Sequence, residues 1–408
     1  MKKNIYLVLF ALLLGIGAVS CDNESEDLFE QTAAERKTDA IKEYDEALKS
    51  AENGWLFQYF PEEEQKYGGY NYIVKFKEQD SVIVWMEGEA DPETSMYDVI
   101  AYGGPVLTFN TYNSLMHKYA TPSADEYNAK GGDFEFLLMS NNDDVITLQG
   151  NKTGNDLRLI KLTETPEEYL MKLKSISKVL KGATFEGNVG GAEVMVISNY
   201  NRLEFTYSEG GENKVVDEAF IVTDKGIEFY KEISILGNDI SELILDKATN
   251  QLVSENGEVV IDVISSPIDM KSTRWYCNIG AETDRSDAIR TEWEKVYIAN
   301  GQTYGETLSQ FLQMGPGQGA TGIYIYSDKW LAQYNVIFGG VKGKAGYLDI
   351  TKVGDGFNWS FYTHLMPLID VVADNAPYKV ELDDEDNPTR AKLTSEKDPD
   401  VWFILNKN

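Results

Sequence analysis

The chain has few of the residues that most often serve as metal ligands or nucleophiles. Among 408 residues there are two cysteines and two histidines, His117 and His364. Neither histidine belongs to a metal-binding motif such as His-Glu-x-x-His, and a zinc site would need three or four ligands. The Gly-x-Ser-x-Gly turn of serine hydrolases is also missing. We therefore expect no metal, no cofactor and no catalytic residue, and a structural or surface position for both histidines.

Positive charge is also scarce. Lysine and arginine total 37 against 67 acidic residues, which gives a formal net charge of −30. Such a surface repels phosphate backbones and anionic lipid headgroups, so nucleic acid is excluded as a partner. The acidity favours a well-solvated body that stays apart from its neighbours.

Long apolar runs are missing beyond Gly17. The strongest later candidate, residues 361–373, contains His364, Pro367 and Asp370 and is typical of buried core. The body of the chain is therefore not expected to cross a membrane.

The one clear targeting signal lies at the start of the chain. Lys2 and Lys3 precede an apolar run over residues 5–17, and small residues lead to Ser20 and Cys21. This order is typical of a signal peptide over residues 1–20. Two interpretations are open. The segment is either a lipoprotein signal or an ordinary signal peptide in which a cysteine happens to follow the cleavage site.

The segment resembles the lipobox of bacterial lipoproteins. The resemblance implies cleavage between Ser20 and Cys21, lipid attachment to the Cys21 sulfur and acylation of the new amino terminus. Two or three acyl chains of the palmitate type hold a protein at a membrane far more firmly than one. The acidic residues 21–28 are expected to form a tether, and they resemble the surface-export signal of Bacteroidota-type lipoproteins. Cys277 would then be the one remaining thiol, most simply a small buried hydrophobe.

The periodicity predicts an α+β fold, predominantly antiparallel β, with meanders and partly closed barrels or sandwiches joined by a few helices. Capping boxes begin helices at Thr32 and Thr165. Further helices are expected over residues 284–300 and 303–311, and short alternating segments predict strands through the rest of the chain.

We divide the mature chain into three parts, namely a helix plus β domain over residues 29–163, a second over 164–270, and a C-terminal α+β domain over 271–408. The first two parts align at an offset of 122 residues around Gly69 and Gly191. They are either a divergent repeat or a chance likeness between β-rich sequences.

Two loops could bind ligands but lack the right context. Residues 317–322 match Gly-x-Gly-x-x-Gly, yet the predicted order is helix, loop, strand, whereas a dinucleotide site needs strand, loop, helix. Residues 383–388 are acidic but lack the spacing of a calcium loop, so a solvated hairpin turn is favoured.

Aromatic residues near the glycine loop are the remaining clue to function. Flat rings can stack on sugars or on the apolar patch of a partner, although the alternative is that they pack the core. The candidate ligand surface comprises Tyr324, Tyr326, Trp330, Tyr334 and Trp359.

Three motifs together resemble a family of uncharacterised Bacteroidota cell-envelope lipoproteins that share a domain of unknown function. They are Asn53-Gly54-Trp55, Gly103-Gly104-Pro105-Val106-Leu107-Thr108-Phe109-Asn110 and Gly131-Gly132-Asp133-Phe134-Glu135-Phe136. The resemblance implies an exported, lipid-anchored protein and carries no catalytic residues.

The leading hypothesis is a non-enzymatic outer-membrane lipoprotein, facing the cell surface, that binds a glycan, a peptide or a partner protein. One alternative is a carboxylate-based glycoside hydrolase, which needs two facing acidic side chains and a raised pKa. The other is a structural or adhesive subunit, which needs exposed sheet edges.

Overall fold

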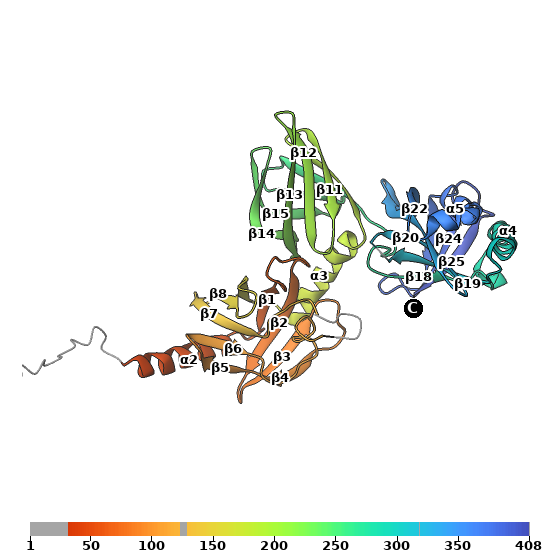
Figure 1. The fold of residues 1–408 in the computed structure, drawn as a ribbon. Helices are drawn as coiled ribbons and strands as arrows, with labels where there is room; N and C mark the ends of the chain where they lie inside the picture. Colours follow the sequence, from red (N-terminus) through yellow and green to blue (C-terminus); the bar gives the residue numbers. More distant parts are fainter. Residues whose placement is uncertain (1–31, 123–128, 318, 408) are drawn as a thin grey trace, which may run out of the picture.

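The computed structural model describes residues 32–122, 129–317 and 319–407. Three antiparallel sheets follow one another along the chain (Figure 1). This confirms the predicted α+β class with antiparallel strands and barrels. Ser20, Cys21 and the whole predicted tether, residues 21–28, lie outside the described residues.

The first sheet follows a helix and contains nine strands in the order β4-β3-β2-β1-β9-β8-β7-β6-β5. Its two end strands, β4 and β5, are consecutive in the chain and separated only by Tyr97, so the sheet curls round until its ends almost meet. The elements are α2 (Ala33–Lys49), β1 (Trp55–Tyr59), β2 (Tyr70–Lys77), β3 (Ser81–Met86), β4 (Glu93–Met96), β5 (Asp98–Ala101), β6 (Pro105–Thr108), β7 (Glu135–Asn141), β8 (Val145–Gly150) and β9 (Asp156–Lys161).

The second sheet is a closed barrel of eight strands. Each strand pairs with the next one along the chain, and the last pairs with the first. A closed meander pairs every strand on both sides and leaves no free edge. The elements are α3 (Pro166–Leu180), β10 (Thr184–Val189), β11 (Ala192–Ser198), β12 (Arg202–Glu209), β13 (Glu212–Val222), β14 (Gly226–Ile235), β15 (Asn238–Asp246), β16 (Gln251–Val253) and β17 (Val259–Ile264).

The third sheet is also a closed eight-stranded meander, but its helices lie within it rather than before it. The elements are β18 (Trp275–Cys277), η1 (Glu282–Asp284), α4 (Asp287–Tyr304), β19 (Leu308–Pro316), β20 (Thr321–Ser327), β21 (Leu331–Val341), β22 (Lys344–Asp355), η2 (Trp359–Phe361), η3 (Thr363–Leu365), α5 (Met366–Ala373), β23 (Tyr378–Leu382), β24 (Arg390–Ser395) and β25 (Trp402–Lys407).

The local capping signals define the first two helices as predicted. The Thr32 and Thr165 side chains each accept a hydrogen bond from the main chain of a glutamate three residues on, and each glutamate side chain accepts one in return. These reciprocal bonds need only a few neighbouring residues, which is why sequence alone located them.

The predicted helix over residues 303–311 is wrong. Helix α4 instead continues to Tyr304 and ends at Gly305, which has the left-handed φ of 63° that favours glycine. Strand β19 then begins at Leu308, because Leu308, Leu312 and Met314 face the barrel core. The loop with the Gly-x-Gly-x-x-Gly match is consequently the tip of the β19–β20 hairpin, with a strand on either side.

Each of the three sheets falls within one of the predicted ranges, although whether each range folds on its own stays a prediction. The first two sheets have similar topologies, each a helix followed by a meander, with nine strands in the first and eight in the closed second. The offset of 122 residues places the β2–β3 hairpin on the β11–β12 hairpin, the second and third strands of both units. Descent of the two units from one ancestor also stays a prediction.

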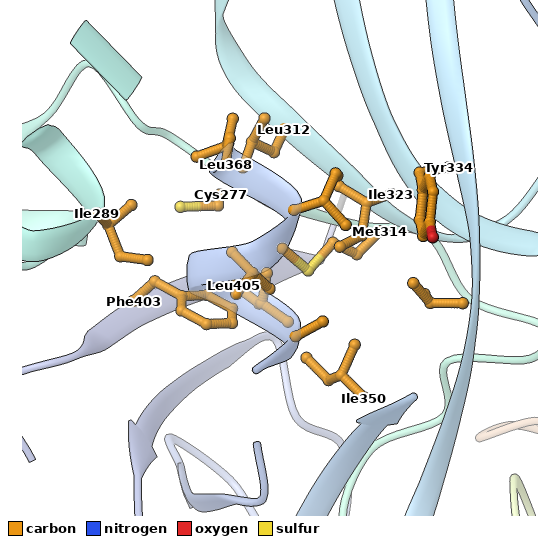
Figure 2. Close-up of a cluster of buried hydrophobic side chains, with 14 of the residues drawn as sticks. Cys277, Ile289, Leu312, Met314, Ile323, Tyr334, Ile350, Leu368, Phe403 and Leu405 are labelled. Carbon is orange, nitrogen blue, oxygen red and sulfur yellow. The ribbon is translucent and has the colours of Figure 1, made fainter. Parts of the chain in front are cut away.

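The third core explains the position of Cys277, whose side chain lies among apolar residues at 1% exposure (Figure 2). Burial raises the pKa of the Cys277 thiol to about 12. Because the thiolate is the reactive form, this thiol behaves as a small hydrophobe, as expected.

Candidate ligand-binding surface on the third barrel

The outer face of the third barrel carries a row of amide and tyrosine side chains that crosses five strands. Met314, Ile323 and Tyr334 point into the core (Figure 2). Side chains alternate along a strand, so their chain neighbours face outward. The strand register aligns one such residue from each of β25, β18, β19, β20 and β21. In that order they are Asn406, Tyr276, Gln313, Tyr324 and Gln333. We call this set the outer row, although Gln313, Tyr324 and Gln333 are themselves buried, at 4%, 2% and 1% exposure.

Two aromatic side chains extend the outer row into a platform. The Phe311 ring centroid lies 6.0 Å from that of Tyr276 and 5.3 Å from that of Tyr326. Phe311 is 36% exposed, and the other two rings are partly exposed. The Tyr326 hydroxyl donates to Gln313 Oε1 at 2.7 Å, which fixes the orientation of both side chains. Burial raises the pKa of Tyr326, so the phenol stays protonated and able to donate.

The far end of the outer row holds an unused hydrogen-bond acceptor. Gln333 is 1% exposed, and its Nε2 donates to Asn335 Oδ1 at 2.7 Å. Its Oε1 has no partner among the described residues. A buried oxygen left without a donor costs roughly 1–3 kcal/mol. A water molecule or a ligand hydroxyl that donates to this oxygen would recover that energy.

The glycine-rich hairpin tip covers one tyrosine of the outer row. The Tyr324 hydroxyl donates to the Ala320 carbonyl at 3.0 Å, and a Cβ atom on Gly317 would overlap with this hydroxyl. The glycine therefore allows the backbone to approach the ring closely. The Gly-x-Gly-x-x-Gly match thus reflects packing against Tyr324, which is 2% exposed.

The five aromatic residues predicted as a ligand surface do not lie together. Tyr324 and Tyr326 lie on the same outer face of β20, where Tyr324 is covered and Tyr326 is partly exposed. Trp330 is 61% exposed in the turn that follows. Tyr334 and Trp359 instead lie inside the core, 4.9 Å apart and edge to face. The reason is strand alternation for Tyr334, and for Trp359 a short 3-10 helix, η2, that turns its ring inward.

Sequence reasoning missed most of the platform. Tyr276, Phe311, Gln313 and Gln333 belong to it, but they stand in four separate stretches that only the barrel register brings together. A usable signal was present in Gln313 and Gln333, since each is a polar residue between apolar strand neighbours.

His364 belongs to a polar cluster at the end of α4. Its Nε2 lies 2.9 Å from Asn300 Oδ1, and the Asn300 amide donates to the Glu306 carbonyl at 3.1 Å. The Glu306 side chain accepts from the Tyr362 hydroxyl at 3.0 Å. Burial lowers the pKa of His364. These contacts join the end of α4 to the turn before β19 and to η3, which is a structural role.

His117 lies in the connection between β6 and β7, where its ring stacks on Phe134 with centroids 5.2 Å apart. The described residues hold no group of three or more side chains arranged to bind a metal ion. Asp383, in the acidic β23–β24 turn, accepts hydrogen bonds from Thr389 and Arg390, which lower the pKa of its carboxyl. The acidic segment is a hydrogen-bonded hairpin turn, as the sequence favoured.

The glycoside-hydrolase alternative requires a raised carboxyl pKa. Burial raises the pKa of Glu87 to about 7 and raises that of Glu218. Glu87 accepts from the Asn71 amide, and Glu218 accepts from the main chain of Ala219. A pocket of about 240 Å³ lies elsewhere, and its lining residues are Arg36, Lys37, Ala40, Ala101, Gly104 and Pro105.

No helix among the described residues is both long and apolar enough to span a membrane. This finding does not bear on the predicted lipid at Cys21, which stays a prediction.

The family comparison identifies the first sheet and most of the second barrel. A family model described as "Domain of unknown function (DUF4302)" matches residues 25–247, more than half of the chain. The chain belongs to this family. The matched region runs from before α2 to the end of β15 and includes all three motifs that carried the resemblance. The third barrel, with the outer row, lies beyond the match.

No curated protein matches the chain. Among solved structures, a putative DNA polymerase III beta subunit from Eubacterium rectale has 9% identity over 90% of this chain and 97% of its own, with a TM-score of 0.13. The sliding clamp of Caulobacter crescentus has 10% identity over 91% and 96%, also with a TM-score of 0.13. TM-scores this low carry no argument about fold or function.

Proposed function

We propose that this DUF4302 protein is a lipid-anchored protein of the bacterial outer membrane, exposed at the cell surface, that binds a glycan through the outer face of its third barrel. The observation that carries the proposal is the group of three partly exposed rings, Tyr276, Phe311 and Tyr326, which contact each other on neighbouring strands above the buried amide of Gln313. Sugar rings present C–H faces that stack on aromatic rings and hydroxyls that pair with amides. A peptide or protein partner would use the same surface.

The geometry favours binding of a sugar over adhesion by strand addition. Strand addition needs an unpaired sheet edge, which the closed β10–β17 and β18–β25 barrels lack. The end strands β4 and β5 of the first sheet do not pair with each other, but each is only four residues long. The platform instead offers three partly exposed rings and the Tyr326 phenol oxygen, which donates its own hydrogen to Gln313 and can accept one from a sugar hydroxyl. A few placed polar groups beside an apolar surface are typical of small-molecule sites.

A glycan array followed by calorimetric titration of residues 22–408 tests the proposal. We expect F311A and Y326A each to weaken binding of the captured glycan about tenfold or more, because each removes a stacking surface. Y102A is the matched control, since Tyr102 is 72% exposed on the first sheet and far from the platform in sequence.

Two results would contradict the proposal. One is unchanged glycan affinity in folded F311A and Y326A proteins. The other is release of reducing ends from the bound glycan, because the proposal assigns this chain binding and no turnover. Sustained hydrolysis abolished by E87Q would support the glycoside-hydrolase alternative instead.

The anchor rests on the lipobox resemblance at Ser20 and Cys21. We expect the mature protein to begin at Cys21 and to carry acyl chains, which mass spectrometry of the amino-terminal peptide would detect. Replacing Cys21 with serine should move the protein from the membrane fraction to the soluble fraction. An unmodified thiol at Cys21 would exclude the lipid anchor while leaving glycan binding open.

A further inference from the structure

Four tyrosine rings surround the ammonium group of Lys130. The Lys130 Nζ atom lies 4.9 Å from the ring centroid of Tyr119, 5.1 Å from that of Tyr67, 5.3 Å from that of Tyr70 and 5.7 Å from that of Tyr200. The same atom donates to the Tyr70 hydroxyl at 3.4 Å. We call these four rings the tyrosine cage.

The tyrosine cage is assembled from two sheets. Tyr67, Tyr70 and Tyr119 come from the first sheet and its connections, whereas Tyr200 lies in the β11–β12 turn of the second. The rings also contact each other in pairs, with centroids 4.4 Å apart for Tyr70 and Tyr119 and 5.1 Å apart for Tyr67 and Tyr200. The cage therefore exists only when the first and second sheets are docked.

Hydrogen bonds hold the two sides of the cage in place. The Gly69 amide donates to the Phe220 carbonyl at 2.9 Å, and the Asn201 side chain donates to the Gly69 carbonyl at 2.7 Å. Tyr200 itself has a φ of 52°, a left-handed conformation that is rare for a bulky residue. Such a strained residue persists only where its surroundings hold it, so the ring is positioned before any ligand arrives.

Ring faces carry negative charge density and attract cations within about 6 Å. A lysine ammonium is compact and strongly hydrated, so it loses much of its water to enter such a cage. A quaternary ammonium group is larger and has no N–H group to solvate, and aromatic cages are a recurrent way of binding it. The rings that hold Lys130 are thus suited to a different cation.

We propose that the tyrosine cage is a binding site for small quaternary ammonium solutes and that Lys130 occupies it as an internal ligand. Among the four rings, that of Tyr200 is the most exposed to solvent, at 55%. Because Lys130 is tethered beside the rings, it competes at an effective concentration in the millimolar range. Removing its ammonium group opens the cage.

The test is to titrate the wild-type protein and the K130A variant with choline and to measure binding by calorimetry and by NMR of the tyrosine rings. We expect K130A to bind choline at least about tenfold more tightly than wild type. The control variant is K231A, because Lys231 lies over a single ring, that of Tyr230, at 5.8 Å. It should behave as wild type. A second variant, K130A/Y200A, should lose the increase in choline affinity that K130A shows.

A neutral probe separates the cage from general attraction to an acidic protein. The probe is 3,3-dimethylbutan-1-ol, which has the shape of choline without its charge, and all titrations are made at the same ionic strength. Cation–π binding predicts that K130A prefers choline, and equal binding of both probes would overturn the proposal. Weak choline binding to a correctly folded K130A protein would overturn it as well.

A final arm distinguishes a free solute from a lipid headgroup. Phosphatidylcholine vesicles should not bind K130A more tightly than phosphatidylglycerol vesicles if the ligand is a free solute. Preferential binding to phosphatidylcholine would overturn that part of the proposal. Glycan binding by the third barrel is measured with other ligands and other variants, so either proposal can fail alone.

Discussion

At the scale of single residues, the contact of Asn71 with Glu87 is the most sensitive to pH. Asn71 is fully buried, and its Nδ2 donates to Glu87 Oε2 at 2.9 Å and to the Val222 carbonyl at 2.8 Å. Burial raises the pKa of Glu87 from its ordinary value near 4.5 to about 7, while the bonds from Asn71 oppose this rise. One carboxyl beside the joint between two sheets is therefore protonated in the folded state at mildly acidic pH.

The pH dependence follows from the raised pKa. Below about pH 4.5 both states are protonated at Glu87, so this group has no effect on stability. Between pH 4.5 and 7 the unfolded state ionises first, so stability falls as pH rises and levels off above pH 7. The raised pKa of Glu87, reduced in effect because its side chain is partly exposed, lowers the free energy of unfolding by about 1–3 kcal/mol across this range.

We expect E87Q to remove this decline. Chemical denaturation at pH 5 and pH 8 should show wild type losing about 1–3 kcal/mol relative to E87Q between the two pH values. E209Q, changed in an exposed hairpin, is the control and should follow wild type. Parallel curves for wild type and E87Q would show that Glu87 titrates normally.

At the scale of elements, strand β13 contributes to two hydrophobic cores. Ala219 and Ile221 lie in the core of the first sheet, whereas Phe220 and Val222 lie in that of the second barrel. Strand alternation sends successive side chains to opposite faces, so a strand buried on both sides can join two units. Close approach of the first sheet to β13 depends on Gly69.

We expect G69A to destabilise this joint by about 1–3 kcal/mol, the usual cost of overpacking. A Cβ atom there would lie 2.7 Å from Ile221 Cβ and from the Phe60 ring. G104A is the matched control, because a Cβ on Gly104 meets nothing within 4 Å. Denaturation curves should separate the two variants, and equal midpoints would show that the joint can expand freely.

At the scale of the whole molecule, the first two sheets are joined differently from the third. The core of the first sheet includes side chains of β13, and that of the second barrel includes Leu56 and Ile73. The third core draws all its buried members from residues 268–405. Salt bridges link the second and third barrels, with Lys342 2.6 Å from Glu186 and 2.7 Å from Asp262. Surface ion pairs contribute little to stability.

Calorimetry should therefore show two unfolding transitions, one for the first two sheets together and one for the third barrel. We expect L393A, in the third core, to lower the transition temperature of the third barrel. L159A, in the first core, should lower that of the first two sheets. Both side chains are fully buried, and such truncations cost about 2–5 kcal/mol. A single transition lowered equally by both variants would show that all three sheets unfold together.

Features were predictable from the sequence when the interacting residues are close together along the chain. The helix beginnings at Thr32 and Thr165 were predictable because each capping box closes within three residues. The β class was predictable from alternation. The helix expected after residue 303 failed because the core positions of β19 outweighed a local capping pattern.

The sequence by itself determined the secondary-structure class, the shortage of metal ligands and the acidic surface, since these depend on composition and on neighbours along the chain. Tertiary structure alone decided which tyrosines face outward on the third barrel, which aromatic residues enter its core, and how residues 67, 70, 119 and 200 surround Lys130. Strand register and the docking of two sheets make these contacts, and both arise from packing between segments far apart in the chain.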